Sequence, residues 1–288
     1  MRRAFGAIIL LAAMLAPGAG RAGQNRAREL AERTLANQHK DDAVINDYER
    51  VEERVSYEDH SVKSDQTYRL VPTGTGRVSL LLERGGQPVD LATYRKEIRD
   101  WQKAIEMALD PENPAEGRAV AKRRERDGKR KELIDAVGRA FDFQWLGEKV
   151  VDGRKLAEIG LDPNPSFQPT SRETEMLRHV RVTVWIDERA AQLVRGRAEI
   201  ISPISIVGGI LAQIYPGGWF EIEQAEAAPG LWVPRRIEFS IRGRILFVSV
   251  SQHKLIKAWG YRYVGSPQQA LELARQDMAR NALFSPKP

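Results

Sequence analysis

Residues 178–201 read RHVRVTVWIDERAAQLVRGRAEII. Apolar residues fall at every second position of the first half: Val180, Val182, Val184 and Ile186. This alternation has the period of a β-strand with one buried face. A second strand is expected over 192–201, and a connection this short joins antiparallel neighbours. The stretch therefore predicts an antiparallel sheet as the core of the fold.

Further strands are expected on both sides of this stretch. From residue 142 onward the chain is almost wholly of β type, and Asp152 and Gly153 suit a tight hairpin turn. The expected strands, eleven in number, cover the following ranges: 44–58, 66–71, 77–83, 143–151, 154–161, 178–187, 192–201, 218–225, 231–241, 244–253 and 257–264. Strands joined mostly by short turns predict one large, curved, mainly antiparallel sheet.

Helices are expected near both ends of the chain and in its middle, which makes the fold class α+β. A domain at 23–265 begins with a helix over 26–38, and a helix over 266–282 with a tail to residue 288 follows the domain. The domain contains a helical insertion at 90–140, in which the first helix has one continuous apolar face. The apolar positions of this face are Leu91, Tyr94, Ile98, Trp101, Ile105 and Leu109, and its candidate covering stripe is Tyr94, Ile98, Trp101 and Ile105. A large sheet cannot leave its apolar face in water, so this helix is expected to cover it.

The first 22 residues have the pattern of a cleaved secretory signal. Arg2 and Arg3 form a basic start, residues 4–16 are an apolar run, and small residues follow. As a helix the run rises about 20 Å, which is short of the roughly 30 Å of a bilayer core. Cleavage is expected after Gly20 or Ala22, with export of the mature chain; an uncleaved anchor is the alternative. Because no Cys follows the run, a lipid-anchored form is not expected.

The sequence contains no recognisable catalytic or metal-binding motif. It has no Cys and four His, and no two His have the spacing of a metal-binding helix. A Gly-x-Ser-x-Gly nucleophile elbow is also absent. Disulfides and thiolate metal sites are excluded. We therefore expect no enzyme activity, no metal ion and no cofactor; an enzyme whose catalytic group is assembled only in space is the least favoured alternative.

A dense block of basic residues lies between residues 118 and 131, where eight basic residues accompany two acidic ones. Without residues 1–22 the chain has 42 basic and 39 acidic residues, so the high pI depends on this block. The block is either a docking surface for an anionic membrane or an acidic partner, or a solvated helix face. Nucleic acid is not an expected partner, because the charge is local and the chain is exported. The candidate docking residues are Arg123, Arg124, Arg126, Lys129, Arg130 and Lys131.

Residues 204–215 form an apolar segment between two expected strands. Gly208 and Gly209 in its middle give it backbone freedom. The segment is expected either to fill the core or to act as a mobile plug that lies against the sheet and yields to a ligand. As a plug, it would place Ile210 and Leu211 in a movable wall.

Several short motifs resemble the periplasmic outer-membrane lipoprotein-sorting (lipoprotein-carrier) superfamily. They are 142–147 (DFQWLG), 184–187 (VWID) with 193–195 (LVR), 232–237 (WVPRRI), a turn at 241–244 (IRGR), and 259–263 (WGYRY). The resemblance implies a periplasmic, half-open barrel of about eleven strands, whose apolar cavity is closed by helices and carries the acyl chains of lipoproteins. The insertion at 90–140 is longer and more basic than a minimal lid, and the terminal helix lies beyond the expected end strand. The family's lid-fixing basic residue cannot be placed on any one Arg of this chain.

These expectations combine into a carrier-like protein with a helical lid over an apolar cavity. The predicted lid residues are Tyr94, Ile98, Trp101, Ile105, Ile210 and Leu211. The predicted residues of the concave sheet face are Phe143, Trp145, Val182, Val184, Phe220 and Phe239. The alternative is a cell-envelope binding or regulatory module that senses lipid or lipoprotein through protein contacts, without transport. The expected partners are lipid or lipoprotein acyl chains, with a membrane-bound donor or acceptor protein as a further candidate, and the expected state is a monomer.

Overall fold

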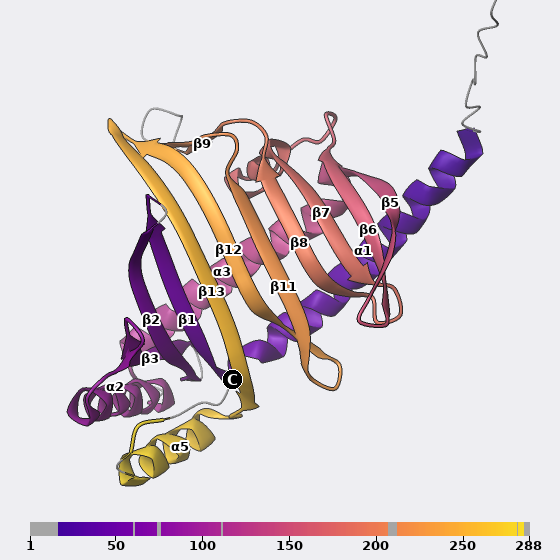
Figure 1. Ribbon diagram of the computed structural model, residues 1–288. Coiled ribbons are helices and arrows are strands. Elements are labelled where there is room, and N and C mark those ends of the chain that lie inside the picture. Colours follow the sequence, from indigo (N-terminus) through magenta and orange to yellow (C-terminus); the bar gives the residue numbers. More distant parts are fainter. Residues whose placement is uncertain are drawn as a thin grey trace, which may run out of the picture.

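The computed structural model describes residues 17–59, 61–73, 76–110, 112–206, 212–280 and 282–284, and one large antiparallel sheet dominates it (Figure 1). The sheet has 13 strands, most of which follow one path in the order β4-β3-β2-β1-β13-β12-β11-β8-β7-β6-β5. The two ends of this path, β4 and β5, do not pair, so the sheet is an open half-barrel. The expected α+β class with a mainly antiparallel, half-open barrel is confirmed.

The strands on this path are antiparallel to their neighbours. The bounds of all strands, on and off this path, are β1 Tyr48–Glu58, β2 Ser61–Pro72, β3 Arg77–Arg84, β4 Gln87–Pro88, β5 Phe141–Val151, β6 Arg154–Pro163, β7 Val180–Asp187, β8 Gln192–Ile200, β9 Ile204–Ile206, β10 Ala212–Ile214, β11 Trp219–Ala228, β12 Leu231–Ile245 and β13 Val248–Tyr263. Strand β10 pairs with β9 and β12, off the main path. Tyr48 lies opposite Tyr263, so the first and last long strands meet in the middle of the sheet.

Helices lie on the sheet in two groups. The bounds are α1 Pro17–Val44, α2 Leu91–Leu109, α3 Pro114–Ala140, α4 Arg172–Glu175 and α5 Pro267–Arg280. Helices α1 and α3 pass behind the sheet in Figure 1, whereas α2 and α5 pack together beside β1–β3. The Asp90 side chain accepts a hydrogen bond from Thr93 N and caps α2. Among the described residues, no helix combines the length and the apolar character needed to span a membrane.

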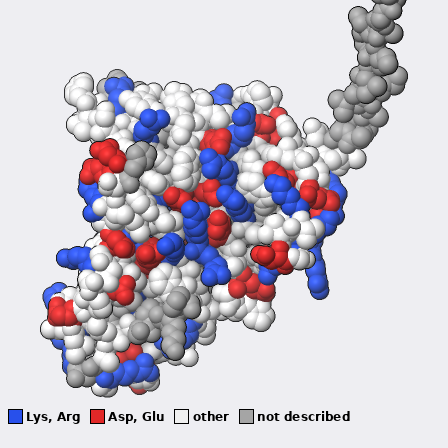
Figure 2. Space-filling view, in the orientation of Figure 1, with Lys and Arg blue, Asp and Glu red and all other residues white. Residues whose placement is uncertain are grey.

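Residue alternation gives the central strands two chemically different faces. On one face, charged side chains form a row that crosses the sheet from β8 to β1: Arg195, Glu223, Arg236, Lys257 and Glu53. Figure 2 shows this charged face, with basic and acidic side chains intermixed in its centre. The opposite face carries mostly apolar side chains on the same strands and is turned toward α1 and α3, so we call it the helix face.

The buried apolar residues form two separate clusters. The first, which we call the α2–α5 cluster, contains Val51, Val71, Leu80, Leu82, Tyr94, Ile98, Trp101, Ile105, Val264, Ala270 and Ala274. The second, which we call the α1–α3 cluster, contains Ala27, Leu30, Ala31, Ala136, Ala140, Phe141, Phe143, Ala157, Ile159, Leu161, Phe167, Leu177, Ile186 and Ala191. Each cluster therefore joins one group of helices to one end of the sheet.

A buried ion network closes the α2–α5 cluster. Arg69 on β2 is fully buried and donates hydrogen bonds to Glu49 at 2.7 and 2.9 Å and to the Tyr94 hydroxyl at 3.2 Å. It also pairs with Asp277 on α5. Burial alone would lower the pKa of Arg69, but Glu49, Tyr94 and Asp277 raise it above its usual value. The charged guanidinium therefore ties β1, β2, α2 and α5 together.

The last hairpin differs from the sequence expectation. A turn was expected at 241–244, but β12 continues through Gly243 and the chain turns at Leu246 and Phe247. Gly243 allows β10 to approach β12 closely, because a Cβ at this position would collide with the Gln213 carbonyl oxygen of β10. Helix α1 also differs, since it begins at Pro17, before the expected cleavage positions at Gly20 and Ala22.

The two edges of the sheet are built differently. At one edge, β4 has two residues. At the other edge, β5 has 11 residues, and its pairing with β6 shifts register between Trp145 and Gly147. Glu148 and Lys149 follow this bulge and form ion pairs with Lys155 and Glu158 of β6. One edge is therefore short, and the other is bulged and charged.

Candidate functional site

The candidate site lies on the helix face, in the middle of the sheet. Phe220 of β11 lies opposite Phe239 of β12, and the next row places Ile222, Ile237 and Ile256 side by side on β11, β12 and β13. Phe220 is 41% exposed, and the other four are half-buried. Apolar residues on the covered face of a central strand are normally buried. This surface, which we call the trough, therefore suits an apolar ligand.

The part of the helix face next to the trough is tightly covered. Helix α1 packs against β5, β7 and β8, and its Gln38 accepts a hydrogen bond of 2.9 Å from Gln224 of β11. A cavity of about 100 Å³ remains between α1, α3 and the sheet, lined by residues that include Leu35, Val137 and Val184. This space corresponds to about three water molecules, so the covered part has no room for an extended acyl chain.

The six residues predicted for the concave face do share one face of the sheet. Phe143, Val182, Phe220 and Phe239 lie in a single cross-strand row, and Trp145 and Val184 lie in the next one. Phe143 is buried in the α1–α3 cluster, with Trp145, Val182 and Val184 packed against it. Phe220 and Phe239 lie in the trough. Four of the six predicted residues therefore lie under the helices, and two lie in the open trough of the same face.

The predicted lid stripe lies elsewhere. Tyr94, Ile98, Trp101 and Ile105 are fully buried in the α2–α5 cluster, where the Trp101 indole donates a hydrogen bond of 3.1 Å to the Pro72 carbonyl oxygen. The structure does not bring the stripe to the residues predicted for the concave sheet face. Helices α1 and α3 lie on that face instead. The physical reason is that β1–β3 also present apolar side chains, which the stripe covers. Ile210 and Leu211 lie outside the described residues.

Four of the six candidate docking residues of the basic block form ion pairs with acids of this chain. Lys129 pairs with Glu125 at 3.0 Å and with Glu173 of α4 at 3.5 Å, and Arg130 pairs with Asp42 of α1. Lys131 and Arg123 form pairs within α3, with Asp135 and Asp127 respectively. Of these four bases, Lys129 and Arg130 therefore link α3 to α4 and α1. Arg124 is exposed, and the charge of Arg126 acts on Arg77 of the sheet.

Arginines border the trough on the side of β1. Arg54 lies opposite Ile256 in the same row, and Arg50 precedes it on the same face. Glu52 lies between them and accepts hydrogen bonds of 2.8 Å from Arg50 and 2.7 Å from Arg54. Burial raises the pKa of Glu52, but these two guanidinium groups hold it below its usual value. The trough thus ends in a basic border, which sequence analysis missed because no local motif marks it.

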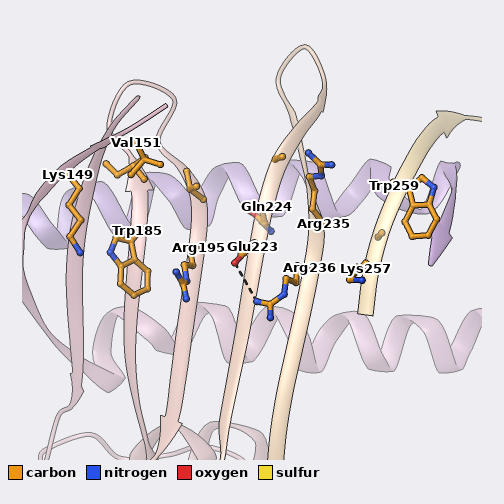
Figure 3. A pocket seen from close by; sticks show the side chains of 14 residues that line it. Lys149, Val151, Trp185, Arg195, Glu223, Gln224, Arg235, Arg236, Lys257 and Trp259 are labelled. Atoms are coloured by element: carbon orange, nitrogen blue, oxygen red, sulfur yellow. Dashed lines mark ion pairs between the residues drawn. The ribbon is translucent and has the colours of Figure 1, made fainter. Parts of the chain in front are cut away.

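A broad groove of about 660 Å³ lies on the charged face (Figure 3). Trp185 and Trp259 lie toward its two sides, and three of the basic side chains between them, Arg195, Arg236 and Lys257, pair with acids of this chain. Arg236 lies 3.5 Å from Glu223, and Lys257 lies 2.8 Å from Glu53. Because most of these charges are matched within the chain, the groove offers less to a ligand than the trough does.

Comparison with known proteins identifies structural likeness without sequence likeness. No family model matches the chain, and no curated protein matches its sequence. A DUF1329 family protein from Desulfovibrio piger is 11% identical with a TM-score of 0.33, and covers 84% of this chain and 93% of its own. A LolA superfamily protein from Nitrosomonas europaea is 10% identical with a TM-score of 0.33, at coverages of 85% and 96%. An outer membrane lipoprotein-sorting protein domain from Vibrio parahaemolyticus is 9% identical with a TM-score of 0.30, at coverages of 85% and 99%. The chain is similar to these proteins in fold.

Proposed function

We propose that this chain is a carrier-like protein of the periplasm that binds the acyl chain of a lipoprotein or lipid in the trough. The observation that carries the proposal is the incomplete burial of Phe220, Phe239, Ile222, Ile237 and Ile256 in the centre of a sheet. The secretory pattern of residues 1–22 supports export of the chain.

An acyl chain supplies enough free energy to occupy this surface. Full burial of one CH₂ contributes about 0.8 kcal/mol, so a fully buried chain of about sixteen carbons contributes on the order of 12 kcal/mol before the costs of binding, and a chain along an open surface contributes part of this. The cavity of about 100 Å³ under α1 and α3 is too small for it. The chain therefore lies along the open trough, and any part that passes under the helices displaces them.

The proposal is tested with N-phenyl-1-naphthylamine, a neutral dye that fluoresces in apolar surroundings, and with monopalmitoylglycerol as the competing ligand. The wild-type protein should bind the dye and release it as monopalmitoylglycerol is added. The variant Ile256→Asp puts a charge in the trough and should weaken dye binding about tenfold or more.

The neighbouring residue supplies a matched control. Leu255 is also half-buried on β13, but it lies opposite Glu238 on the charged face. The variant Leu255→Asp should therefore bind the dye as the wild type does. Equal binding by Ile256→Asp and wild type, or no binding by the wild type, would exclude the trough as the site.

The second candidate is an envelope module that works through protein contacts. It is favoured by the tip of the β12–β13 hairpin, where Phe247 is 99% exposed beside Ile245, Leu246 and Val248, each at least 48% exposed. Exposed apolar clusters of this kind mark contact surfaces. In this case the wild-type protein would not take up the dye, and Phe247→Ser would weaken partner binding. Dye uptake by the wild type and unchanged uptake by Phe247→Ser would favour the carrier.

A further inference from the structure

Five arginines from four elements act together at the β1 side of the trough. Arg50 and Arg54 belong to β1, Arg77 to β3, Arg126 to α3 and Arg235 to β12. The charges of Arg50, Arg54 and Arg126 act on Arg77, and those of Arg50, Arg77 and Arg235 act on the half-buried Tyr261 side chain. We call these five residues the arginine cluster.

One carboxylate balances only part of this charge. Glu52 uses Oε1 for Arg50 and Oε2 for Arg54, so both of its oxygens are occupied. Within the described parts of the chain, Arg77, Arg126 and Arg235 form no ion pair. Five guanidinium groups with one carboxylate leave an excess of about four positive charges.

This excess favours an anionic ligand. Burial lowers the pKa of Arg77, the charges of Arg50, Arg54 and Arg126 lower it further, and the charge of Glu52 opposes them, although the Arg77 side chain is exposed. Neighbouring like charges repel each other, and an anion placed among them reduces this repulsion. The α2–α5 cluster shows the opposite arrangement, in which Arg69 is matched by carboxylates of the chain itself.

The arginine cluster is ordered and continuous with the trough. The Arg50 guanidinium lies 5.8 Å from the centre of the Tyr261 ring, and that of Arg54 lies 4.8 Å from the Tyr68 ring, so aromatic faces orient both. A cavity of about 60 Å³ joins the two surfaces. The residues that line it include Arg50, Glu52, Arg235, Tyr261 and the trough residues Ile237 and Ile256.

We propose that the arginine cluster binds the phosphate group of an amphiphile whose acyl chain lies in the trough. Guanidinium groups pair with phosphate oxygens through two parallel hydrogen bonds, and a phosphate ester carries more charge and more acceptors than a carboxylate does. This inference rests on the proposed function and narrows it, because it names the polar end of the ligand as well as the apolar end.

Two amphiphiles with the same palmitoyl chain test the proposal in the dye assay. Palmitoyl lysophosphatidic acid carries a phosphate monoester, whereas monopalmitoylglycerol carries no charge. The phosphate ester should displace the dye at concentrations about tenfold lower, and its advantage should shrink as salt is added. The double variant Arg77→Gln/Arg126→Gln should lose most of this advantage and keep the wild-type affinity for monopalmitoylglycerol. Both residues are exposed, so the variant should fold.

A second double variant controls for net charge. Arg99 on α2 and Arg275 on α5 are exposed and lie on the helices of the other cluster. The variant Arg99→Gln/Arg275→Gln loses the same two charges and should keep the full advantage of the phosphate ester. Loss of the advantage in this control would show a general charge effect and overturn the proposal.

The remaining outcomes separate this inference from the proposed function. Equal affinity of the wild type for both amphiphiles would overturn the phosphate site while leaving the trough in place. Failure of both amphiphiles to displace the dye would overturn the trough itself. If millimolar inorganic phosphate abolishes the advantage at constant ionic strength, free phosphate is the ligand, and the assignment to a lipid headgroup is wrong.

Discussion

The α2–α5 cluster and the trough are built from the same kinds of residue, yet they differ in burial and in charge pairing. In the α2–α5 cluster, Tyr94, Ile98, Trp101 and Ile105 are at most 1% exposed, and carboxylates on β1 and α5 match Arg69. In the trough, apolar side chains are half-buried, and the arginine cluster beside them has one carboxylate.

This difference means that one region stabilises the fold and the other is available to bind a ligand. A closed cluster adds to the free energy of folding with every side chain that it buries and every charge that it pairs. An open surface with unpaired charges contributes less to folding, and a ligand that covers it gains free energy of binding instead. Residue type alone does not distinguish the two, since each region combines aromatic, aliphatic and arginine side chains. Substitutions in the two regions should therefore have unequal effects.

The largest effect is expected from Arg69→Ala. The substitution removes the buried partner of the Glu49 and Asp277 carboxylates and leaves them only the exposed Arg262 and Arg280, which should lower the free energy of unfolding by about 3–5 kcal/mol. Urea denaturation measures this change. Arg262→Ala is the control, because Arg262 also pairs with Glu49 but is 52% exposed, and it should cost about 1 kcal/mol or less. Similar losses for both variants would mean that burial does not determine the cost.

The next effect in size is the difference in stability between Trp101→Ala and Phe239→Ala. Trp101 is fully buried, and its removal should cost about 3–5 kcal/mol of stability. Phe239 is half-buried in the trough, so its removal should cost clearly less than that of Trp101. The order should reverse for dye binding, which Phe239→Ala should weaken. Thermal unfolding and the dye assay on both variants check the two orders, and a trough variant as unstable as Trp101→Ala would refute the contrast.

The smallest effect is expected from the pH dependence of Glu52. Because its pKa in the folded protein lies below the usual value, Glu52 contributes stability above about pH 4.5, and this contribution is lost as the pH falls through the folded pKa. Wild type should therefore lose more stability than Glu52→Gln between neutral pH and pH values below 4.5, measured by urea unfolding. Glu58→Gln serves as control, because Glu58 pairs with Lys63 on an exposed surface. Parallel pH profiles of stability for wild type and Glu52→Gln would contradict a lowered pKa of Glu52 in the folded protein.

Local patterns in the sequence predict most of the sheet. The alternation at Val180, Val182, Val184 and Ile186 predicts β7, and the alternation at Ile237 and Phe239 predicts the trough side of β12. Both follow from the two-residue period of a strand, which needs no knowledge of the neighbours. The same reasoning placed Phe220 and Phe239 on one face, and the register agrees.

The choice of helix for each face could not be predicted in this way. The stripe that includes Tyr94 and Trp101 predicts that α2 packs on an apolar surface, but it does not indicate which end of the sheet provides that surface. Helix α3 has no strong apolar face over most of its length; it packs on the helix face through Ala136 and Ala140 near its end, while Lys129 and Arg130 pair with α4 and α1. The arginine cluster joins residues as far apart as Arg50 and Arg235, so only the strand order brings them together.

An open sheet keeps two borders whose backbone groups could recruit another chain. A closed barrel has no such borders, whereas a half-barrel has to protect them. The two residues of β4 offer almost no template, and on β5 the bulge at Gly147 and the charges of Glu148 and Lys149 interrupt a regular ladder. The protein can thus keep an accessible hollow without inviting strand addition, self-association and fibrillar aggregation.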